Sequence, residues 1–159
     1  MSPELQPGLR HVQRIRVSES LTVPALSHAF ASFDDMPAVF ATALMVGFIE
    51  WACLEALRPY LDPGEHTVGT HIDVSHVAAT PVGMMATAEV ELIEIHGRKL
   101  RFKVSCRDEL DLIGEGFHER FVIDGATFAA RLAAKSAKTG NLDLPGAKPS
   151  VSAGLGKSG

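Results

Sequence analysis

One nearly continuous apolar run, AVFATALMVGFIEWACLEAL, spans residues 38–57 and restricts the folds open to this chain. Pro37 before the run and Arg58-Pro59 after it are typical of helix boundaries. Because apolar residues occupy nearly all sides of the predicted helix, we expect it to be buried in a core. Glu50 is the exception within it, since an ionised carboxylate is costly to bury unless it has a partner or changes its protonation state.

After residue 64 the pattern changes from a helical period to the alternation of β-strands. The alternation slips near Leu92-Ile93, which is typical of a β-bulge, and His96-Gly97 is typical of a hairpin turn. The expected strands are a weak one at 11–17 and stronger ones at 70–76, 85–95, 100–107 and 112–123.

Alternation also predicts which side chains of these strands share a face. The strand 70–76 should place Thr70, Ile72, Val74 and His76 on one face. The strand 100–107 should point inward with Leu100, Phe102, Val104 and Cys106. The last strand should have Ile113, Phe117, Phe121 and Ile123 on one face and Gly114, Gly116, His118 and Arg120 on the other, where glycines leave room for another group to approach.

The order of strand, loop, helix and four long strands fits an antiparallel sheet wrapped around one central helix, the α+β arrangement called the hot-dog fold. We expect one domain over residues 1–139 with a lid-like loop at 21–37 and a short helix at 125–138, followed by a disordered tail at 140–159. A lone sheet of this kind leaves an edge uncovered, so we expect two copies to pair as a homodimer.

Composition and charge argue against several classes of partner. A net charge of −4 gives no general attraction to nucleic acid. Cys53 and Cys106 have neither the number nor the spacing of a disulfide framework or zinc site, and no metal or cofactor is expected. Glu50 and Glu55 make membrane insertion of the apolar run costly. Since residues 1–14 also lack the pattern of a signal peptide, we expect a cytoplasmic protein.

Four polar residues could carry chemistry, and each has a structural alternative. Glu50 is either a nucleophile or general base, or a helix carboxylate bonded to the backbone or to an arginine. His76 is either a proton carrier or a hydrogen-bonded core residue; His71 points to the opposite face of the predicted strand, which argues against a metal site. Thr42 lies where a hydroxyl commonly caps a helix, and Arg120 could hold an anionic group or form a surface ion pair.

Thr42 and Glu50 are eight residues apart. On one straight helix this spacing separates their Cα atoms by about 12 Å, which prevents direct contact. The two side chains can therefore cooperate only through His76, through a water or substrate, or across a dimer interface.

Several segments in order, MVGFIEWAC, PYLDPGE, VGTHIDVSH, AATPVG and GEGFHER, resemble the fluoroacetyl-CoA thioesterase family of hot-dog proteins. The resemblance extends from Pro37 to about Asp124, roughly the middle two-thirds of the chain. It implies an acyl-CoA thioesterase without a cofactor, with catalytic positions at Thr42, Glu50 and His76. It also implies substrate contacts at Gly69 and Arg120.

The lid departs from the pattern that the resemblance implies. Phe33 is present, but Met36 stands where a second aromatic gating residue is expected. Methionine is flexible and can still cover a pocket, although it defines a less rigid gate than an aromatic ring. We therefore expect hydrolysis of a short-chain CoA thioester, with the fluoroacetyl ester as one candidate and selectivity for the fluorinated acyl group left open.

Two other functions remain to be separated from this one. A hot-dog enoyl-CoA hydratase or dehydratase would also pair a histidine with a carboxylate. A non-catalytic acyl-CoA binding module would keep the pocket without turnover, although a mere binder has little need for a carboxylate such as Glu50.

Overall fold

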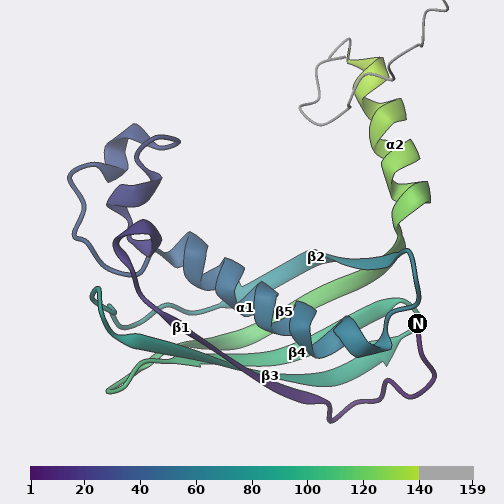
Figure 1. The fold of residues 1–159 in the computed structure, drawn as a ribbon, viewed down its shortest axis with the longest axis horizontal. Coiled ribbons are helices and arrows are strands. Elements are labelled where there is room, and N and C mark those ends of the chain that lie inside the picture. Colours follow the sequence, from purple (N-terminus) through teal and green to yellow (C-terminus); the bar gives the residue numbers. More distant parts are fainter. Residues whose placement is uncertain (140–159) are drawn as a thin grey trace, which may run out of the picture. The chain divides into compact units, whose positions relative to one another are not determined.

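The computed structural model describes residues 1–139, and within them a curved five-stranded antiparallel sheet wraps around helix α1 (Thr42–Leu57), as Figure 1 shows. The strand order is β1-β3-β4-β5-β2, so β2 lies at one edge next to β5. The strands are β1 (Arg10–Arg16), β2 (Glu65–Val74), β3 (Met85–His96), β4 (Lys99–Arg107) and β5 (Leu112–Asp124). The predicted antiparallel sheet around one helix is confirmed.

Residues 1–125 form one compact unit, and the second unit begins at Ala126, within α2 (Gly125–Lys138). The terminal helix predicted at 125–138 is confirmed by α2. The tail expected to be disordered, 140–159, lies outside the described residues. Within the described part, no helix is long and apolar enough to cross a membrane.

Helix α1 begins later than the apolar run predicts. Residues 38–41 precede the helix, because Val39 and Phe40 form isolated β-bridges and Phe40 N–H donates to the Thr80 carbonyl at 2.8 Å. The helix therefore starts at Thr42, with Ala41 as an extended N-cap residue that provides no side-chain bond. This correction places Thr42 at the first helical position.

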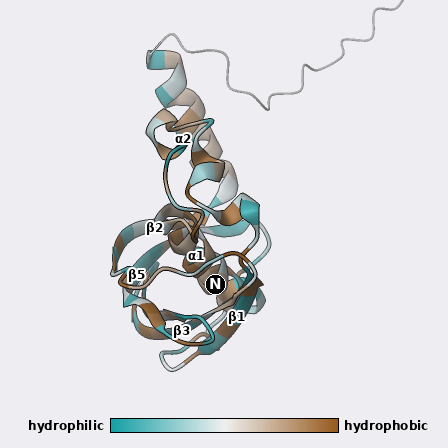
Figure 2. Cartoon of the chain, turned by 90° about the vertical axis from the view of Figure 1, so that its left-hand side faces the viewer, coloured by the Kyte–Doolittle hydropathy of each residue, from teal (hydrophilic) through white to brown (hydrophobic). Residues whose placement is uncertain are grey.

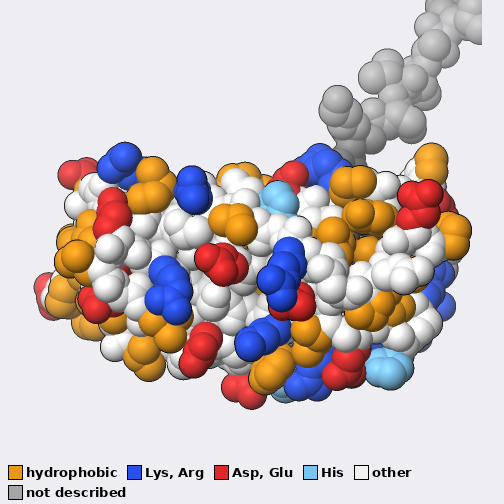
Figure 3. Space-filling view, turned by 90° about the horizontal axis from the view of Figure 1, so that it is seen from below, with side chains coloured by type: hydrophobic (Ala, Val, Ile, Leu, Met, Phe, Trp, Pro, Cys, Tyr) orange, Lys and Arg blue, Asp and Glu red, His pale blue; other side chains and the backbone are white. Residues whose placement is uncertain are grey.

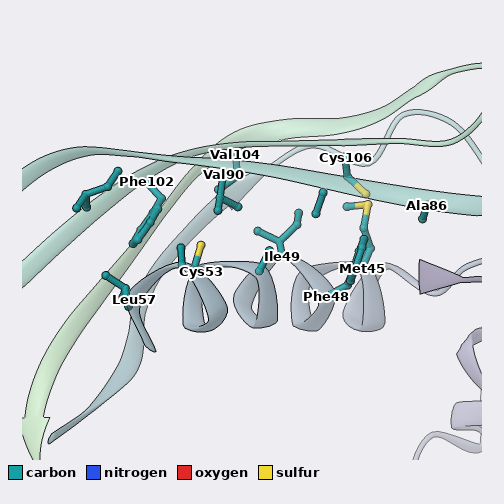
Figure 4. Packing of buried hydrophobic residues seen from close by; sticks show 14 of the residues in the cluster. Met45, Phe48, Ile49, Cys53, Leu57, Ala86, Val90, Phe102, Val104 and Cys106 are labelled. Atoms are coloured by element: carbon teal, nitrogen blue, oxygen red, sulfur yellow. The ribbon is translucent and has the colours of Figure 1, made fainter. Parts of the chain in front are cut away.

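Only one face of α1 is buried, which corrects the expectation of burial on all sides. A single sheet covers the side of the helix that carries Met45, Ile49 and Cys53, and these side chains pack against β3 and β4 (Figure 4). Trp51 and Leu54 on another side remain 40% and 37% exposed. The end-on view in Figure 2 shows the sheet curling around the helix without enclosing it.

The β3–β4 hairpin follows the sequence pattern closely. The register shifts between Leu92 and Glu94, as the slipped alternation predicts, and Gly97 occupies the turn with φ +60°. All four inward residues predicted for β4 are buried. The strongly alternating segments therefore confirm both the strands and their faces.

The inner face of β5 differs from the prediction. His118, Arg120 and Val122 are buried, whereas Phe121 is 40% exposed. Polar His118 and Arg120 can lie inside because they bond to each other and to neighbouring groups, a possibility that apolar alternation cannot reveal. The nearby Gly116 makes room for the strand β2, since a Cβ at Gly116 would overlap the Asp73 carbonyl oxygen.

Three short 3-10 turns lie at the start of and within the lid-like loop at 21–37: η1 (Glu19–Leu21), η2 (Pro24–Leu26) and η3 (Ala31–Phe33). The base of this loop is closed by backbone bonds from Val23 N–H to Val39 O at 3.1 Å and from Ala41 N–H to Leu21 O at 2.9 Å. The lid therefore leaves and rejoins the sheet next to the start of α1, at the left of Figure 1.

The face of the molecule seen in Figure 3 carries charges of both signs. Positive, negative and apolar side chains are interspersed in Figure 3, without a large patch of one charge on the face shown. On β4, Arg101 lies over the Phe117 ring and 3.6 Å from a Glu119 oxygen, so this exposed cation already has partners within the chain.

Candidate active site

Glu50 lies beside a buried arginine. Its Oε1 accepts a hydrogen bond from Arg120 Nη1 at 3.2 Å, and the Glu50 side chain is 38% exposed whereas that of Arg120 is 4% exposed. Glu50 is thus half-buried, which corrects the expectation of a fully buried carboxylate. Oε2 has no hydrogen-bond partner among residues 1–139 and is available to a ligand.

The guanidinium of Arg120 is held firmly by the edge strand. Its Nε donates to Thr67 Oγ1 and its Nη2 to the Thr67 carbonyl oxygen, each at 2.9 Å. Arg120 is therefore not a surface residue, which corrects one of the two alternatives that the sequence left open, while its contact with an anionic group of the substrate stays a prediction. It is a buried cation whose exposed-side partner is Glu50.

Gly69 lies directly against the Glu50 carboxylate. A Cβ built at Gly69 would overlap Glu50 Oε1 and lie 3.1 Å from His118 Cε1. The glycine therefore makes the space that the carboxylate occupies. The structure brings together three of the predicted site residues, Gly69, Glu50 and Arg120.

Thr42 and His76 form a second group at the start of α1. Thr42 Oγ1 and His76 Nδ1 are hydrogen-bonded at 2.8 Å. Burial lowers the pKa of His76 against the opposing effect of the Ala78 backbone, so the ring is neutral at neutral pH. Its Nε2 is buried and has no partner within the described residues, as expected of a group that awaits a ligand.

His76 lies beyond the end of β2 instead of on its inner face, which corrects the sequence prediction. A register shift between Gly69 and His71 breaks the alternation, and Ile72 is 41% exposed. The chain stays extended past the strand, because Val77 N–H donates to the Ile113 carbonyl at 2.9 Å.

An open pocket of about 270 Å³ adjoins Thr42 and His76. Its other lining residues are Val23, Val39, Phe40, Val77, Ala78 and Ala79, so apolar side chains surround the polar pair. Of the predicted gating residues, Phe33 packs against Phe30 with ring centroids 5.3 Å apart and Met36 is 49% exposed. Neither residue lines this pocket.

Thr42 and Glu50 belong to one continuous helix, so about two turns separate the two groups. Glu50 contacts Arg120 and His118, while Thr42 contacts His76. Within one chain, the three predicted catalytic residues are therefore divided between two places.

Other nucleophiles and metal ligands contribute little. Burial raises the pKa of both Cys53 and Cys106 to about 12, so neither is a thiolate at neutral pH. Within residues 1–139, no group of three or more His, Cys, Asp or Glu side chains is arranged to hold a metal ion.

Comparison with known proteins decides the family. The family model described as fluoroacetyl-CoA-specific thioesterase matches residues 18–126. The chain belongs to this family. It is 43% identical over 136 residues to the fluoroacetyl-CoA thioesterase of Streptantibioticus cattleyicolor, covering 86% of this chain and 98% of that relative. Membership confirms the sequence-based resemblance and the assignment to the thioester hydrolases.

Solved structures confirm the fold. A variant of the family member FlK in complex with acetyl-CoA is 42% identical, with a TM-score of 0.81 over 83% of this chain and 99% of that one. A hot-dog-like protein from Thermanaerovibrio acidaminovorans is 20% identical, with a TM-score of 0.69 over 84% of this chain and 93% of that one. The predicted hot-dog fold is therefore confirmed for this family member.

Sequence reasoning missed His118 and Thr67 as neighbours of the site. Both contact Arg120, and both are buried. The only available signal was the position of His118 two residues before Arg120, which places both side chains on one face of a strand. Thr67 gave no signal, because its role depends on the pairing of β2 with β5.

Proposed function

We propose that this chain hydrolyses short-chain acyl-CoA thioesters to the free acid and CoA. The observation that carries the proposal is the Glu50 carboxylate, which is fixed at Oε1 by buried Arg120 and has Oε2 free. A carboxylate held in this way is oriented for attack without being fully engaged. The acyl-CoA complex of the related FlK supports the substrate class.

The reaction breaks the C–S bond of the thioester and forms a C–O bond with water. Either Glu50 attacks the carbonyl carbon and expels the CoA thiolate, leaving a mixed anhydride that water then hydrolyses to the acid and the free carboxylate, or Glu50 takes a proton from a water that attacks the thioester directly. His76, neutral at neutral pH, carries the proton to the departing thiolate, and Thr42 orients the ring through its bond to Nδ1. A backbone N–H near Gly69 stabilises the developing oxyanion.

Arg120 and Gly69 shape the part of the site around Glu50. Arg120 holds the carboxylate in place, and the missing side chain at Gly69 leaves the space that the carboxylate occupies. We propose that the acyl group binds next to the free Oε2 of Glu50, close to the substrate-contacting positions Gly69 and Arg120 that the resemblance implies. Phe33 and Met36 line no pocket in the single chain, and we propose that they approach the site when substrate binds, where the flexible Met36 side chain would admit acyl groups other than fluoroacetyl.

We further propose a homodimer in which each site uses both chains. The edge of β2 that does not face β5 offers unpaired backbone groups, and exposed Trp51, Leu54 and Ile72 lie on α1 and β2. If two β2 strands pair antiparallel about an axis between Ile72 and Asp73, the partner's His76 lies opposite Gly69. The separated groups then meet, because Gly69 touches Glu50.

A thiol-release assay over acetyl-, fluoroacetyl-, propionyl- and longer acyl-CoA esters tests the function. Glu50→Gln should abolish turnover and leave the thermal unfolding midpoint nearly unchanged, because the amide keeps the shape of the carboxylate but can neither attack nor accept a proton. Glu55→Gln is the matched control on the same helix, since Glu55 bonds to Trp51 and Arg58 instead.

Hydrolysis by Glu50→Gln at the unaltered rate would refute the assignment of Glu50. Binding of CoA esters without thiol release would indicate a binding module, and conversion of an enoyl-CoA without thiol release would indicate a hydratase. A preference for long chains would overturn the short-chain proposal.

A further inference from the structure

His118 contacts both charged groups of the proposed site, Glu50 and Arg120. His118 lies on β5 and is 2% exposed. Its Nε2 is 3.1 Å from Arg120 Nη1 and 3.5 Å from Glu50 Oε1. A titratable ring buried between a carboxylate and a guanidinium influences both of them.

The hydrogen bonds of His118 define its tautomer. Nδ1 is 2.8 Å from the His71 carbonyl oxygen, and a carbonyl oxygen can only accept, so Nδ1 carries a proton. Arg120 Nη1 can only donate, so Nε2 must be an unprotonated acceptor. Both contacts are satisfied by the neutral Nδ1–H ring and by no other state of the imidazole.

The same Arg120 nitrogen bonds to His118 and to Glu50. Nη1 has two hydrogens, and its two acceptors are His118 Nε2 and Glu50 Oε1. Thr67 accepts from the other two nitrogens of the guanidinium. Without an acceptor at His118, one buried N–H of Arg120 would lack a partner or would turn toward Glu50.

We propose that His118 is a positioning residue for hydrolysis: its neutral ring accepts from Arg120 and leaves Glu50 with a single hydrogen bond at Oε1. This inference rests on the proposed function, because it explains how the Glu50 carboxylate stays oriented and reactive. A protonated ring would donate to Oε1 as a second donor and would place a positive charge beside Arg120. Both effects would make the carboxylate a weaker nucleophile and base.

The surroundings of the ring favour the neutral form. Burial lowers the pKa of His118, and the positive charge of Arg120 acts in the same direction. The bond to the His71 carbonyl and the charges of Glu50 on α1 and Glu119 on β5 oppose this shift. Cys53 of α1 stays a neutral thiol, since burial raises its pKa to about 12.

Two substitutions at His118 distinguish the role of its hydrogen-bond acceptor from the role of a ring that can ionise. His118→Leu removes the acceptor, and kcat should fall by roughly 10- to 100-fold, because a buried charged donor is left without its partner. His118→Gln can present its amide oxygen to Arg120 and should recover most of that loss while remaining unable to ionise. His96→Gln on the exposed β3–β4 turn is the matched control and should keep the unaltered kcat.

Two-bond ¹H–¹⁵N correlation spectra measure the protonation state of the His118 ring independently of the kinetics. Comparison with the spectrum of His118→Gln identifies the signals of His118. At pH 7 we expect protonated Nδ1 and unprotonated Nε2. An Nε2–H or doubly protonated ring overturns the inference even if the Leu variant fails to fold. Equal kcat in the Leu variant and the unaltered chain, or equal losses in the Leu and Gln variants, also overturns it.

These experiments distinguish a failure of the proposed function from a failure of the role proposed for His118. If the unaltered chain releases no thiol from any acyl-CoA, the function is refuted and the inference with it. If the unaltered chain is active but the variants or the spectra disagree with expectation, only the role of His118 is refuted.

Discussion

Among the residues around the Glu50 carboxylate, Gly69 has the least room for a larger side chain. It does not have a positive φ, so its requirement is spatial and not conformational. A methyl group there would displace Glu50 Oε1 and press on His118. Gly69→Ala should therefore lower kcat at least about tenfold, since a small misplacement of a reacting group is costly, while the unfolding midpoint changes little.

Steady-state kinetics and thermal unfolding of the same preparation check this expectation. Thr70→Ala is the neighbouring control, because Thr70 is exposed and its hydroxyl only reaches the Glu119 carbonyl at 3.3 Å. An unchanged kcat in Gly69→Ala would show that the position of the Glu50 carboxylate does not limit the reaction.

The pH dependence of activity should report His76. Burial lowers the pKa of its ring, so the neutral form persists below the ordinary histidine value of about 6.5. Activity that needs the neutral ring is then complete at neutral pH and is lost as the pH falls through the lowered pKa. We expect an acid limb in kcat/KM with its midpoint below about 6.5.

Because His118 also has a lowered pKa, the profile must be repeated in His118→Gln. The limb should persist there if it belongs to His76. A midpoint at or above the ordinary histidine value would mean that His76 is not the group observed.

Among the elements, the loop after β2 connects the segment before α1 to the turn between β4 and β5 through Thr80. Its carbonyl accepts from Phe40 N–H, and its hydroxyl donates to Asp108 Oδ2 at 2.8 Å. Thr80 is fully buried. Thr80→Val keeps the shape but removes the donor, so we expect a loss of about 1–3 kcal/mol in the free energy of unfolding at neutral pH.

The loss should shrink in acid. Burial by itself raises the pKa of Asp108, but bonds from Asp111, Leu110 and Thr80 lower it overall. A lowered folded-state pKa stabilises the fold above the unfolded value of about 3.9, and this contribution disappears as the pH falls through the folded value. Urea unfolding at several pH values measures the difference, with Thr87→Val on β3 as the control; a constant difference would contradict the role of Asp108.

Strands and helices with a regular apolar periodicity could be predicted from the sequence, whereas residue positions that depend on how strands pair with one another could not. The prediction of the β3–β4 hairpin was correct because apolar and polar residues alternate without interruption from Leu100 to Cys106. The predicted position of His76 was wrong because the shift between Gly69 and His71 depends on how β2 pairs with β5. Glu50 was recognised as unusual, but its partner Arg120 lies 70 residues away and becomes a neighbour only through the sheet.

At the scale of the whole molecule, Thr42 and His76 lie apart from Glu50 within one chain, and a second copy of the chain would bring these groups together. A chain with Glu50→Gln supplies His76 but no reactive carboxylate, and a chain with His76→Ala supplies the reverse. If each site draws on both chains, a mixed dimer contains one complete site and one that lacks both groups. If each site lies within one chain, no site of the mixed dimer is complete.

Mixing the two inactive variants after joint refolding should therefore restore activity, up to about half of the unaltered rate per mixed dimer, since one of its two sites is intact. Light scattering measures the mass of the species, and thiol release measures its activity. The control carries Ile72→Lys in both chains, which places like charges at the proposed β2–β2 contact and should prevent both pairing and recovery. A dimer that forms but recovers no activity would show that each site lies within a single chain, and proton transfer between Glu50 and His76 would then have to run through a substrate or water.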